Sequence, residues 1–473
     1  MTTGERYLRM NQLPADGEIH AVGAAGLETA SMVRYLVEGG RDDIVLHDAA
    51  TDFDAAFWAA HRFQPVEHRT RSQAALARCR QLRRGLDYLA GIESAAAVLV
   101  PVSWFLHPIN ARLEPLQDRF VSYPDACFDL WRGPVIGVTG SYGKTTTTRF
   151  AATLVDGIVC GNDRESFSDL AALARQPPDR CLAFEVSNRH LRNGFRRILE
   201  VGVLTGITLN HEPDHGSFRA YRQVKYSMAA RCQDFLYHAA VAATFPDAAG
   251  ITKRGASYGD GGAWQLRAGT VQGPEGRRCP LPGAMRLSAL DRDNAVAAAA
   301  AALLCGASVE QVERHSRSLA ASTPRYRQAA REVAGRLVIN DAASCMPAST
   351  AALVRALERR FVLICGGDRQ RYRPGEFDLL AQAVGANPQA ALVCTMGPMA
   401  ANIEAALRRA GFDAVVRAAG VVEAVERAVA APGAAVVFSP GCGTGELFAD
   451  KYVRGEAFDD AVSKLVSAGQ ALP

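Results

Sequence analysis

The sequence predicts an α/β protein with mostly parallel sheets, divided into three domains along 473 residues. Short apolar runs alternate with longer stretches of helical periodicity, which is the pattern of strands joined by crossover helices. Some strands end at glycine turns, as in "EIHAVGAAG" (18–26) and "VIGVTG" (135–140). A chain of this length exceeds one ordinary hydrophobic core, so several domains are expected.

The predicted elements fall into three blocks. Residues 1–132 open with a strand, a helix and a second strand ("DIVLHDA", 43–49), the start of a Rossmann-like unit. Residues 133–322 carry expected strands at 135–140, 182–187 and 203–210, and an alanine-rich helix in 294–308. Residues 323–473 carry expected strands at 336–341, 361–367, 390–397 and 434–441, so we expect a second Rossmann-like domain there.

The composition indicates a globular protein that acts on small molecules. Apolar residues make up 48% and charged residues 22% of the chain, and the net charge is only +4. Such a balance predicts no nucleic-acid and no membrane partner. We interpret the basic runs at 78–84 and 189–197 as solvated helix faces or local ion pairs, although such runs can bind phosphate groups. A monomer is compatible with the sequence, which does not specify an oligomeric state.

The expected location is the cytoplasm. The eleven cysteines are scattered without a C-x-x-C pair, which fits neither a metal cage nor a secreted disulfide framework. We interpret them as small buried side chains in a reducing compartment. The first residues lack an apolar signal core, and no run approaches the roughly 20 apolar residues of a membrane span.

A candidate phosphate-binding loop, "TGSYGKTT" (139–146), stands between an expected strand and an expected helix. In this arrangement backbone N–H groups face an anion, Lys144 can reach the terminal phosphates and Thr145 can ligate Mg²⁺. The P-loop consensus has an earlier glycine, where this chain has Val138. We expect ATP to be bound by Gly140, Ser141, Tyr142, Gly143, Lys144, Thr145 and Thr146.

Further candidate ligands follow the next strands of the central block. Glu185 ends one strand, and Asn210, Asp214 and His215 come just past the next. Because parallel strands end at one edge of a sheet, these side chains can lie beside bound phosphates and hold divalent ions. Lys225 is puzzling there, since an ammonium repels Mg²⁺. It is either an exposed helix lysine or, once carbamoylated, a carboxylate.

Together these motifs resemble the Mur ligase family, ATP-dependent enzymes that add an amino acid to a peptide on a nucleotide-linked sugar. "TGSYGKTT" fits that family's T-G-[TS]-x-G-K-[TS]-[TS], which has no early glycine. Residues 210–215 are similar to its N-x-x-x-D-H and residues 221–225 to its Y-R-x-x-K. "SPGCGTGELFADKYVRGEAF" (439–458) resembles the glutamate-adding, MurD-type branch. The likeness spans nearly the whole chain and is looser over the first 130 residues.

The resemblance implies a carboxylate–amine ligase. A substrate carboxylate attacks the γ-phosphate of ATP, and the incoming amine then displaces phosphate from the acyl phosphate. The implied catalytic residues are Lys144, Glu185, His215 and Lys225. Of two implied Mg²⁺ ions, Thr145 and Glu185 would hold one, while His215 and carbamoylated Lys225 would hold the other.

The resemblance also assigns nucleotide contacts outside the loop. Asn294 resembles the family's adenine-side asparagine. Arg325 and Asp341 would reach the nucleotide when the C-terminal domain closes, which would exclude water from the acyl phosphate.

The substrate positions depart most from the family pattern. The family's threonine and serine near the incoming amino acid become Cys345 and Thr444, and Gln370 takes the nominal place of a lysine. Changed polar contacts of this kind indicate a different amino acid or orientation. The residues assigned to substrates are Gly23, Asp48, Asn162, Cys345, Gln370, Thr444 and Lys451.

We therefore predict a MurD-like amide ligase, for which the sequence leaves two alternative substrate pairs. One is UDP-N-acetylmuramoyl-L-alanine with glutamate, as in peptidoglycan biosynthesis; the other is a different carboxylate and amino acid of a secondary pathway. A P-loop NTPase or kinase is one alternative, but it would not need the motifs at 221–225 and 439–444. A Mur-like protein without activity is another, disfavoured because the implied catalytic set is present.

Overall fold

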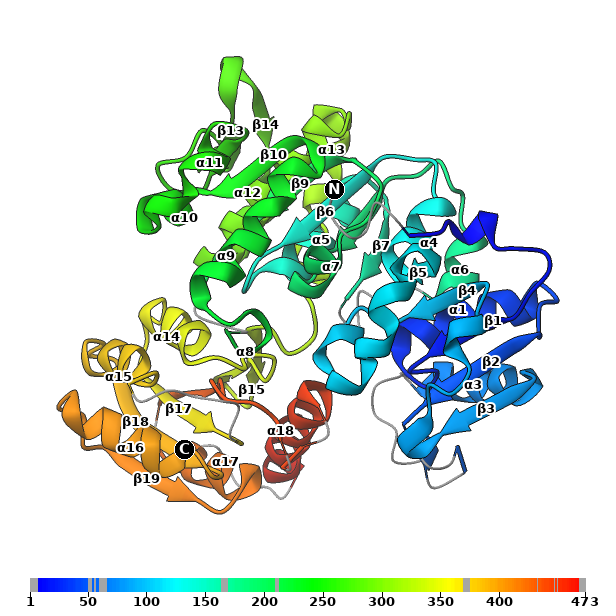
Figure 1. The fold of residues 1–473 in the computed structure, drawn as a ribbon. Helices are drawn as coiled ribbons and strands as arrows, with labels where there is room; N and C mark the ends of the chain where they lie inside the picture. The colour runs from blue at the N-terminus through cyan, green and yellow to red at the C-terminus, as the bar shows by residue number, and fades with distance from the viewer. Residues whose placement is uncertain are drawn as a thin grey trace. The chain divides into compact units, whose positions relative to one another are not determined.

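The chain forms two compact units, residues 1–322 and 323–473. Each holds a sheet of mainly parallel strands with helices in the connections, so the predicted α/β class is confirmed (Figure 1). The computed structural model describes residues 7–49, 53–54, 57–58, 66–162, 169–208, 212–368, 375–431, 433–445, 447–448 and 450–467.

The first unit begins with a five-stranded parallel sheet of order β3-β2-β1-β4-β5. Its strands are β1 (Ile19–Val22), β2 (Ile44–Asp48), β3 (Gln81–Arg84), β4 (Ala97–Val100) and β5 (Phe120–Ser122). The connecting helices include α1 (Leu27–Glu38) and α3 (Val66–Arg78), and α4 (Tyr123–Asp129) follows β5. The order, with β1 between β2 and β4, places the turn after β1 where the chain changes direction across the sheet.

A second parallel sheet in the same unit has the order β11-β10-β9-β6-β8-β7. Its strands are β6 (Val135–Thr139), β7 (Ile158–Gly161), β8 (Leu182–Glu185), β9 (Leu199–Leu204), β10 (Cys232–His238) and β11 (Ala256–Tyr258). The helices around it are α5 (Lys144–Leu154), α6 (Leu170–Ala174), α7 (Asn188–Asn193), α8 (Glu212–His215), α9 (Phe218–Tyr226), α10 (Ala239–Thr244), α11 (Ala249–Thr252), α12 (Ala289–Leu304) and α13 (Val309–Ser316).

Alternate residues of the second sheet enter two different cores. Ile136 and Val138 of β6 pack with α5 and α12 on one face. Leu182 and Phe184 of β8 belong to a core on the other face that continues through α4 into the first sheet. This shared apolar core explains why the two sheets form one compact unit.

The alanine-rich helix α12 is buried along most of its length. Residues 295–302 are 0–1% exposed, between α5 and strands β9 and β10. Side chains as small as alanine allow close helix packing on several sides, so the composition of α12 has a packing reason in addition to helix propensity.

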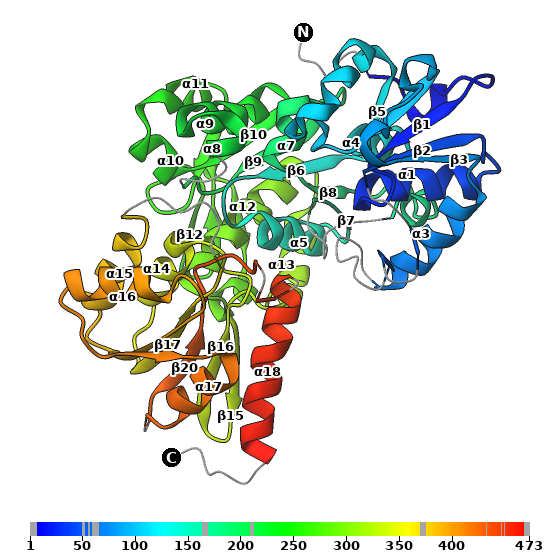
Figure 2. The same ribbon diagram turned by 60° about the horizontal axis from the view of Figure 1, so that its bottom comes forward.

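The second unit contains a six-stranded sheet of order β15-β16-β20-β17-β18-β19. The strands are β15 (Ala329–Val333), β16 (Arg336–Asn340), β17 (Phe361–Gly366), β18 (Ala390–Met396), β19 (Val415–Ala418) and β20 (Ala435–Phe438). Helices α14 (Pro347–Arg355), α15 (Asp378–Gly385) and α16 (Ala400–Arg409) pack on one face. Helices α17 (Val421–Val429) and α18 (Lys451–Ser467) pack on the other, where Figure 2 shows α18 beside α17 and β16.

Two local features differ from the sequence expectation. The strand expected at 203–210 is β9, which runs from Leu199 to Leu204. Beyond Leu204 the backbone still bonds to β6 and its loop: the N–H of Thr205 donates to the carbonyl of Thr139 at 2.8 Å, and the carbonyl of Gly206 accepts from the N–H of Ser141 at 2.8 Å. The sheets are also not purely parallel: β15 pairs antiparallel with β16, and β12 (Gln265–Arg267), β13 (Thr270–Gln272) and β14 (Arg278–Pro280) form a small antiparallel sheet.

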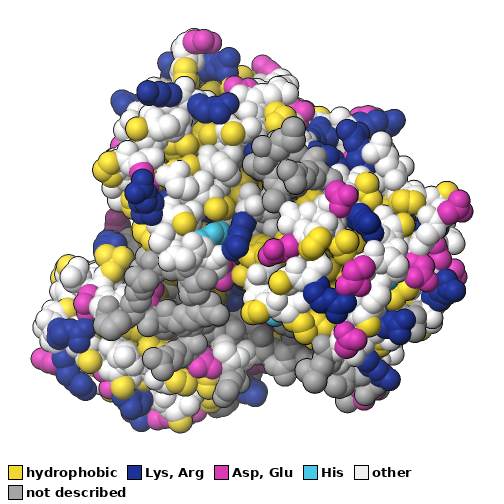
Figure 3. Space-filling model, in the orientation of Figure 1, with side chains coloured by type: hydrophobic (Ala, Val, Ile, Leu, Met, Phe, Trp, Pro, Cys, Tyr) yellow, Lys and Arg dark blue, Asp and Glu magenta, His cyan; other side chains and the backbone are white. Residues whose placement is uncertain are grey.

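Lysines and arginines are interspersed with acidic side chains over the face shown in Figure 3. This mixing is consistent with the small net charge of +4. Within the described residues, each helix is too short or too polar to cross a lipid bilayer.

Candidate active site

The loop after β6 is shaped by two glycines. Gly140 has φ +150° and Gly143 has φ +79°, conformations that L side chains rarely adopt. A Cβ at Gly140 would overlap Oγ1 of Thr205, and one at Gly143 would lie 2.7 Å from Oδ1 of Asn294. The backbone therefore approaches its neighbours so closely that only glycine fits at both positions. Val138, at the site of the consensus glycine, is a fully buried residue of β6 and lies outside the turn.

Hydrogen bonds from neighbouring elements hold this loop. The N–H of Ser141 donates to the carbonyl of Gly206 at 2.8 Å, and Oγ of Ser141 lies 2.9 Å from the hydroxyl of Tyr221. The carbonyl of Tyr142 accepts from Oγ1 of Thr205. These hydrogen bonds anchor the loop on two sides and so fix the position of the N-terminus of α5.

Helix α5 carries the predicted loop residues Lys144, Thr145 and Thr146 in its first turn. Nζ of Lys144 lies 3.4 Å from the carbonyl of Ser141, and Thr145 and Thr146 are buried. A helix N-terminus with a lysine and buried hydroxyl groups is suited to an anion.

Glu185 lies at the carboxyl end of β8, next to β6 in the sheet. Its backbone pairs with Val138 on one side and Gly161 on the other, and its side chain is 2% exposed. Asn162 follows β7 directly, and its N–H donates to the carbonyl of Glu185 at 3.2 Å. Both residues therefore lie at the same sheet edge as the loop.

Lys225 is a buried lysine and not an exposed one. It lies on α9, is 1% exposed, and its Nζ donates to Oγ1 of Thr139 at 2.9 Å. Burial lowers the pKa of Lys225 well below its usual value, and the nearby charge of Lys144 lowers it further, while Glu185 opposes this shift. A lowered pKa favours the neutral amine, which is the form that reacts with carbon dioxide.

His215 lies at the end of α8, opposite the first residue of α7. Its Nε2 is 2.9 Å from Nδ2 of Asn188, and its ring lies 5.5 Å from the ring of Tyr221. Burial lowers the pKa of His215 to about 4, and the positive charges of Arg192 and Arg189 also lower it, while Asp214 opposes this shift. The imidazole is thus neutral near pH 7, as a metal ligand must be.

Asn294 connects α12 to the phosphate-loop helix. Its Oδ1 accepts from Oγ1 of Thr147 at 3.2 Å, and its Nδ2 donates to Oδ1 of Asp291 at 3.1 Å. The structure thus places Asn294 against Gly143 and α5, in contacts internal to the protein. Asn210 lies outside the described residues, and within them no group of three His, Cys, Asp or Glu side chains forms a ready metal cage.

In the first sheet, Gly23 and Asp48 lie at adjacent strand ends. Gly23 has φ +63° in the turn after β1. Oδ2 of Asp48, the last residue of β2, accepts from the N–H of Ala25 at 3.0 Å. Asp48 thus binds the turn that contains Gly23.

In the second unit, loops after three strands meet. Asp341 follows β16, and its carboxylate accepts from Oγ of Ser439 at 2.7 Å and from the N–H of Gln328 at 3.1 Å. Asp368, after β17, donates its N–H to the carbonyl of Gly443, after β20, at 3.1 Å. Thr444 comes next in that third loop.

Arg454 of α18 was not singled out from the sequence, yet it fixes these loops. It is fully buried and donates to the carbonyls of Ala342, Cys442 and Gly443, and Sγ of Cys345 is 3.4 Å from its Nη2. Its place in the "RGEAF" motif is the sequence signal that could have identified it.

The other predicted residues of this unit lie on or near α18. Arg325 is exposed, with Nη2 2.6 Å from the hydroxyl of Tyr326 and 3.6 Å from Oε1 of Glu456. Lys451 begins α18, and its Nζ lies 5.1 Å from the ring centroid of Tyr452. Gln370 falls outside the described residues.

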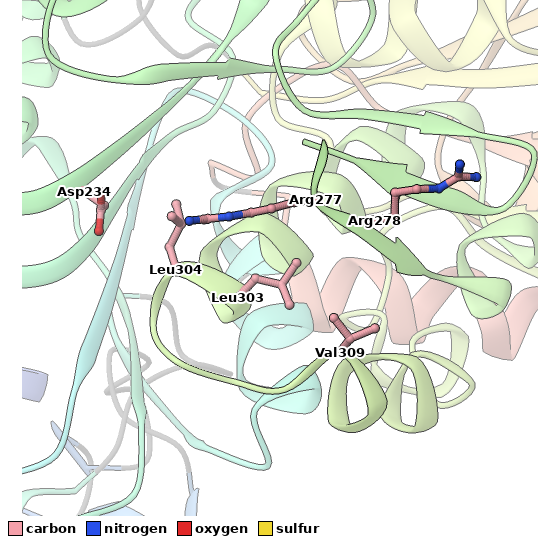
Figure 4. A pocket seen from close by; sticks show the side chains of 6 residues that line it. All are labelled: Asp234, Arg277, Arg278, Leu303, Leu304 and Val309. Atoms are coloured by element: carbon pink, nitrogen blue, oxygen red, sulfur yellow. The ribbon is translucent and has the colours of Figure 1, made fainter. Parts of the chain in front are cut away.

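A cavity of about 400 Å³ lies away from the phosphate loop, at the opposite end of α12 from Asn294. In Figure 4, Arg277 extends toward Leu304, while Arg278 points away from these residues. Its lining is Asp234, Arg277, Arg278, Leu303, Leu304 and Val309. None of the predicted site residues lines it.

Comparison with known proteins places this geometry in a family. No family model matches the chain. It is 30% identical over 370 residues to the UDP-N-acetylmuramoylalanine–D-glutamate ligase of Pelotomaculum thermopropionicum, covering 71% of this chain and 76% of that one. It is 29% identical over 360 residues to the ligase of the same name from Symbiobacterium thermophilum, covering 71% and 77%.

Solved structures agree on the fold. UDP-N-acetylmuramate-alanine ligase MurC from Thermotoga maritima aligns with a TM-score of 0.59 at 14% identity, over 95% of this chain and all of that one. MurF ligase from the same organism, in complex with ADP, aligns with a TM-score of 0.57 at 14% identity, over 98% and 99%. The predicted resemblance is therefore confirmed: this protein belongs to the Mur ligase family, in the MurD-like branch of ATP-dependent amide ligases.

Proposed function

We propose that this ligase joins the carboxylate of UDP-N-acetylmuramoyl-L-alanine to glutamate with formation of ADP and phosphate. The observation that carries the proposal is the convergence of Lys144, Glu185 and Lys225 at the carboxyl edge of one sheet, in a chain 30% identical to a relative of that name. ATP dependence makes the cytoplasm the proposed location, and a monomer is the proposed working unit.

Lys144 would offset the charge of the phosphoryl group in transfer, and the N-terminus of α5 would hold its oxygens. Gly140 and Gly143 leave no room for a Cβ, and the proposed backbone donors are the N–H groups at the start of α5. We propose that Asn294 acts by fixing this loop through Thr147 and by bordering the nucleotide.

The donor chemistry fits magnesium. Thr145 and Glu185 offer oxygen atoms for one ion, and neutral His215 with carbamoylated Lys225 offers nitrogen and oxygen for a second. Magnesium would supply charge neutralisation on the phosphates. Lys225 is a candidate for the carbamate because its amine is buried against Thr139 and burial lowers its pKa.

We propose three functional domains, 1–132, 133–322 and 323–473, with the acceptor held through Gly23, Asp48 and Asn162. Asp341 and Arg325 are proposed to act on the nucleotide. Cys345, Gln370, Thr444 and Lys451 are proposed for the amino acid.

A second substrate pair has its own support. Cys345 stands in place of a threonine, and its sulfur contacts Arg454. A thiol is a weaker hydrogen-bond partner than a hydroxyl, so a pocket in which Cys345 contacts the incoming amino acid would differ from that of a glutamate-adding enzyme. A different carboxylate and amino acid, in a secondary pathway, is therefore the alternative.

A coupled enzyme assay of ADP formation tests both proposed substrate pairs. The full-length protein is assayed with UDP-N-acetylmuramoyl-L-alanine and either D- or L-glutamate, and then with a panel of other amino acids. We expect ADP to form only when both acceptor and amine are present. Phosphate release in the absence of both acceptor and amine would indicate an NTPase. Turnover with another amino acid but not with glutamate would favour the secondary pathway.

The carbamate has a separate test. Lys225→Ala should reduce turnover at least 100-fold, because it removes a proposed metal ligand. Wild-type activity should rise with added bicarbonate after CO₂ is removed. Full activity of the variant, unaltered by bicarbonate, would disprove the assignment.

A further inference from the structure

Helix α7 brings two arginines to the turn that carries His215. Arg189 and Arg192 are three residues apart, so both project from one side of the helix. Nη2 of Arg189 lies 3.2 Å from Oδ2 of Asp214, and Arg192 donates to the backbone carbonyl of Asp214. Asn188, also on α7, lies against His215 itself.

These arginines carry more positive charge than their acidic neighbour balances. Asp214 is the carboxylate that Arg189 meets, whereas the guanidinium of Arg192 lies 3.8 Å from the ring centroid of Phe105. Arg192 is exposed, and among the described residues the buried Nε of Arg189 has no hydrogen-bond partner. Donor capacity and charge are thus left over beside His215.

The arrangement is held rigidly from the first sheet. Nε2 of His190 lies 3.1 Å from Oε1 of Glu28, and the other oxygen of Glu28 accepts from the N–H of Val102 at 2.9 Å. Nδ2 of Asn193 donates to the carbonyl of Val102, also at 2.9 Å. Helix α7 is therefore fixed between the carboxyl ends of β4 and β8, where the two sheets of the first unit meet.

We infer that Arg189 and Arg192 form a subsite for a second anionic group of the acceptor, a phosphate or a carboxylate, next to His215. Guanidinium groups bind such oxygens with two or more parallel hydrogen bonds, and prior fixation of the side chains lowers the entropic cost. This inference rests on the proposed function, because it places the acceptor carboxylate at the same sheet edge.

The competing explanation is that both arginines only anchor Asp214 and hence His215. In that case their loss would weaken all acceptors equally. An anion subsite would instead discriminate acceptors by charge, so the two roles predict different results.

Calorimetric titration of the full-length protein, with ADP present, directly measures how its affinity depends on the charge of the acceptor. The probes are N-acetylmuramoyl-L-alanine, its 1-phosphate, and N-acetylmuramoyl-L-aspartate, which differ in the second anionic group. We expect wild type to bind one of the two charged probes roughly 10- to 100-fold more tightly than the first, and the preferred probe identifies the group. The double variant R189Q/R192Q should lose this preference, and R189K/R192K should keep part of it.

Arg132→Gln is the matched control, since Arg132 is an exposed arginine paired with Asp179 at the protein surface. It should bind all three probes as wild type does. Equal affinity of wild type for the three probes would overturn the subsite, as would a preference that survives in R189Q/R192Q. Binding needs no turnover, so a wild-type preference that is lost in R189Q/R192Q, in a protein that forms no ADP, would count against the proposed ligase reaction and leave the subsite standing.

Discussion

Two glycine turns in the first unit have the same local form and opposite electrostatic surroundings. Residues 23–26 follow β1 and precede α1, and residues 140–143 follow β6 and precede α5. Each has a glycine with positive φ. In both, backbone N–H groups at a helix start are directed toward the end of a parallel strand.

The first turn already has carboxylates of its own chain. Asp48 accepts from the N–H of Ala25, and Glu28 in the first turn of α1 accepts from the N–H of Val102. The second turn is bordered by the cation of Lys144, the first residue of α5. The same backbone motif thus favours a neutral or hydroxyl-rich ligand in one place and phosphate in the other, because neighbouring strands and helices set the charge.

The largest effect is expected when the cation of the second turn, Lys144, is removed. Lys144→Ala should lower the rate of ADP formation by about 1000-fold, equivalent to about 4 kcal/mol of transition-state stabilisation. The exposed Lys253→Ala is the control and should keep its rate. A loss of less than tenfold would show that the turn does not act on transferring phosphate.

The stability of the fold around the first turn should decrease at acidic pH. His47 of β2, whose carbonyl accepts from the N–H of Gly23, lies with Nε2 2.8 Å from Nδ1 of His20. Burial lowers the pKa of His47 to about 4, below its value of about 6.5 when unfolded. The stability held by neutral His47 is therefore complete above pH 6.5 and is lost as the pH falls toward 4, by about 3 kcal/mol.

Urea unfolding at pH 7 and pH 4.5 measures this dependence of the free energy of unfolding on pH. His47→Gln, which cannot be protonated, should unfold with a weaker dependence on pH. An unchanged slope in that variant would place the acid sensitivity elsewhere.

The close packing of the second turn can be separated from its backbone strain. Gly143 and Gly91 both have φ +79°, but a Cβ at Gly143 would lie 2.7 Å from Asn294 and one at Gly91 would meet nothing within 4 Å. Gly91→Ala should cost about 1 kcal/mol from strain alone, and Gly143→Ala about 2 kcal/mol with weaker ATP binding. Thermal unfolding and ATP titration measure the two effects. Equal costs would mean that Asn294 moves aside freely.

The smallest expected effect concerns the carboxylate at the first turn. Asp48→Asn should raise the KM for the acceptor a few-fold and destabilise the fold by about 1 kcal/mol, since an amide oxygen replaces a charged acceptor. Asp43→Asn, at an exposed ion pair with Arg41, is the control. No change relative to that control would remove Asp48 from the acceptor site.

The sequence predicted the parallel sheets and the loop at 139–146 because periodicity and glycine placement are local properties. It did not predict the burial of Lys225, because the residues alone favoured an exposed helix lysine and only the family resemblance indicated a site residue. Which face of α9 enters the core depends on how that helix packs against α7 and α8, and the short-range sequence pattern does not contain this information. Arg189 and Arg192 were interpreted as part of a solvated helix face or of local ion pairs; the ion pair of Arg189 with Asp214 is present, but the sequence did not identify that partner or its position next to His215.

The sequence alone determined the α/β class, the phosphate loop and the likeness to a ligase family, because each rests on consecutive residues with fixed spacing. The tertiary structure decided which charges meet. It brought Lys225 from α9 to Thr139, Arg454 from α18 to the loops after β16 and β20, and two arginines of α7 to Asp214. Electrostatic energies depend on distance and burial in three dimensions, and chain separation says little about either.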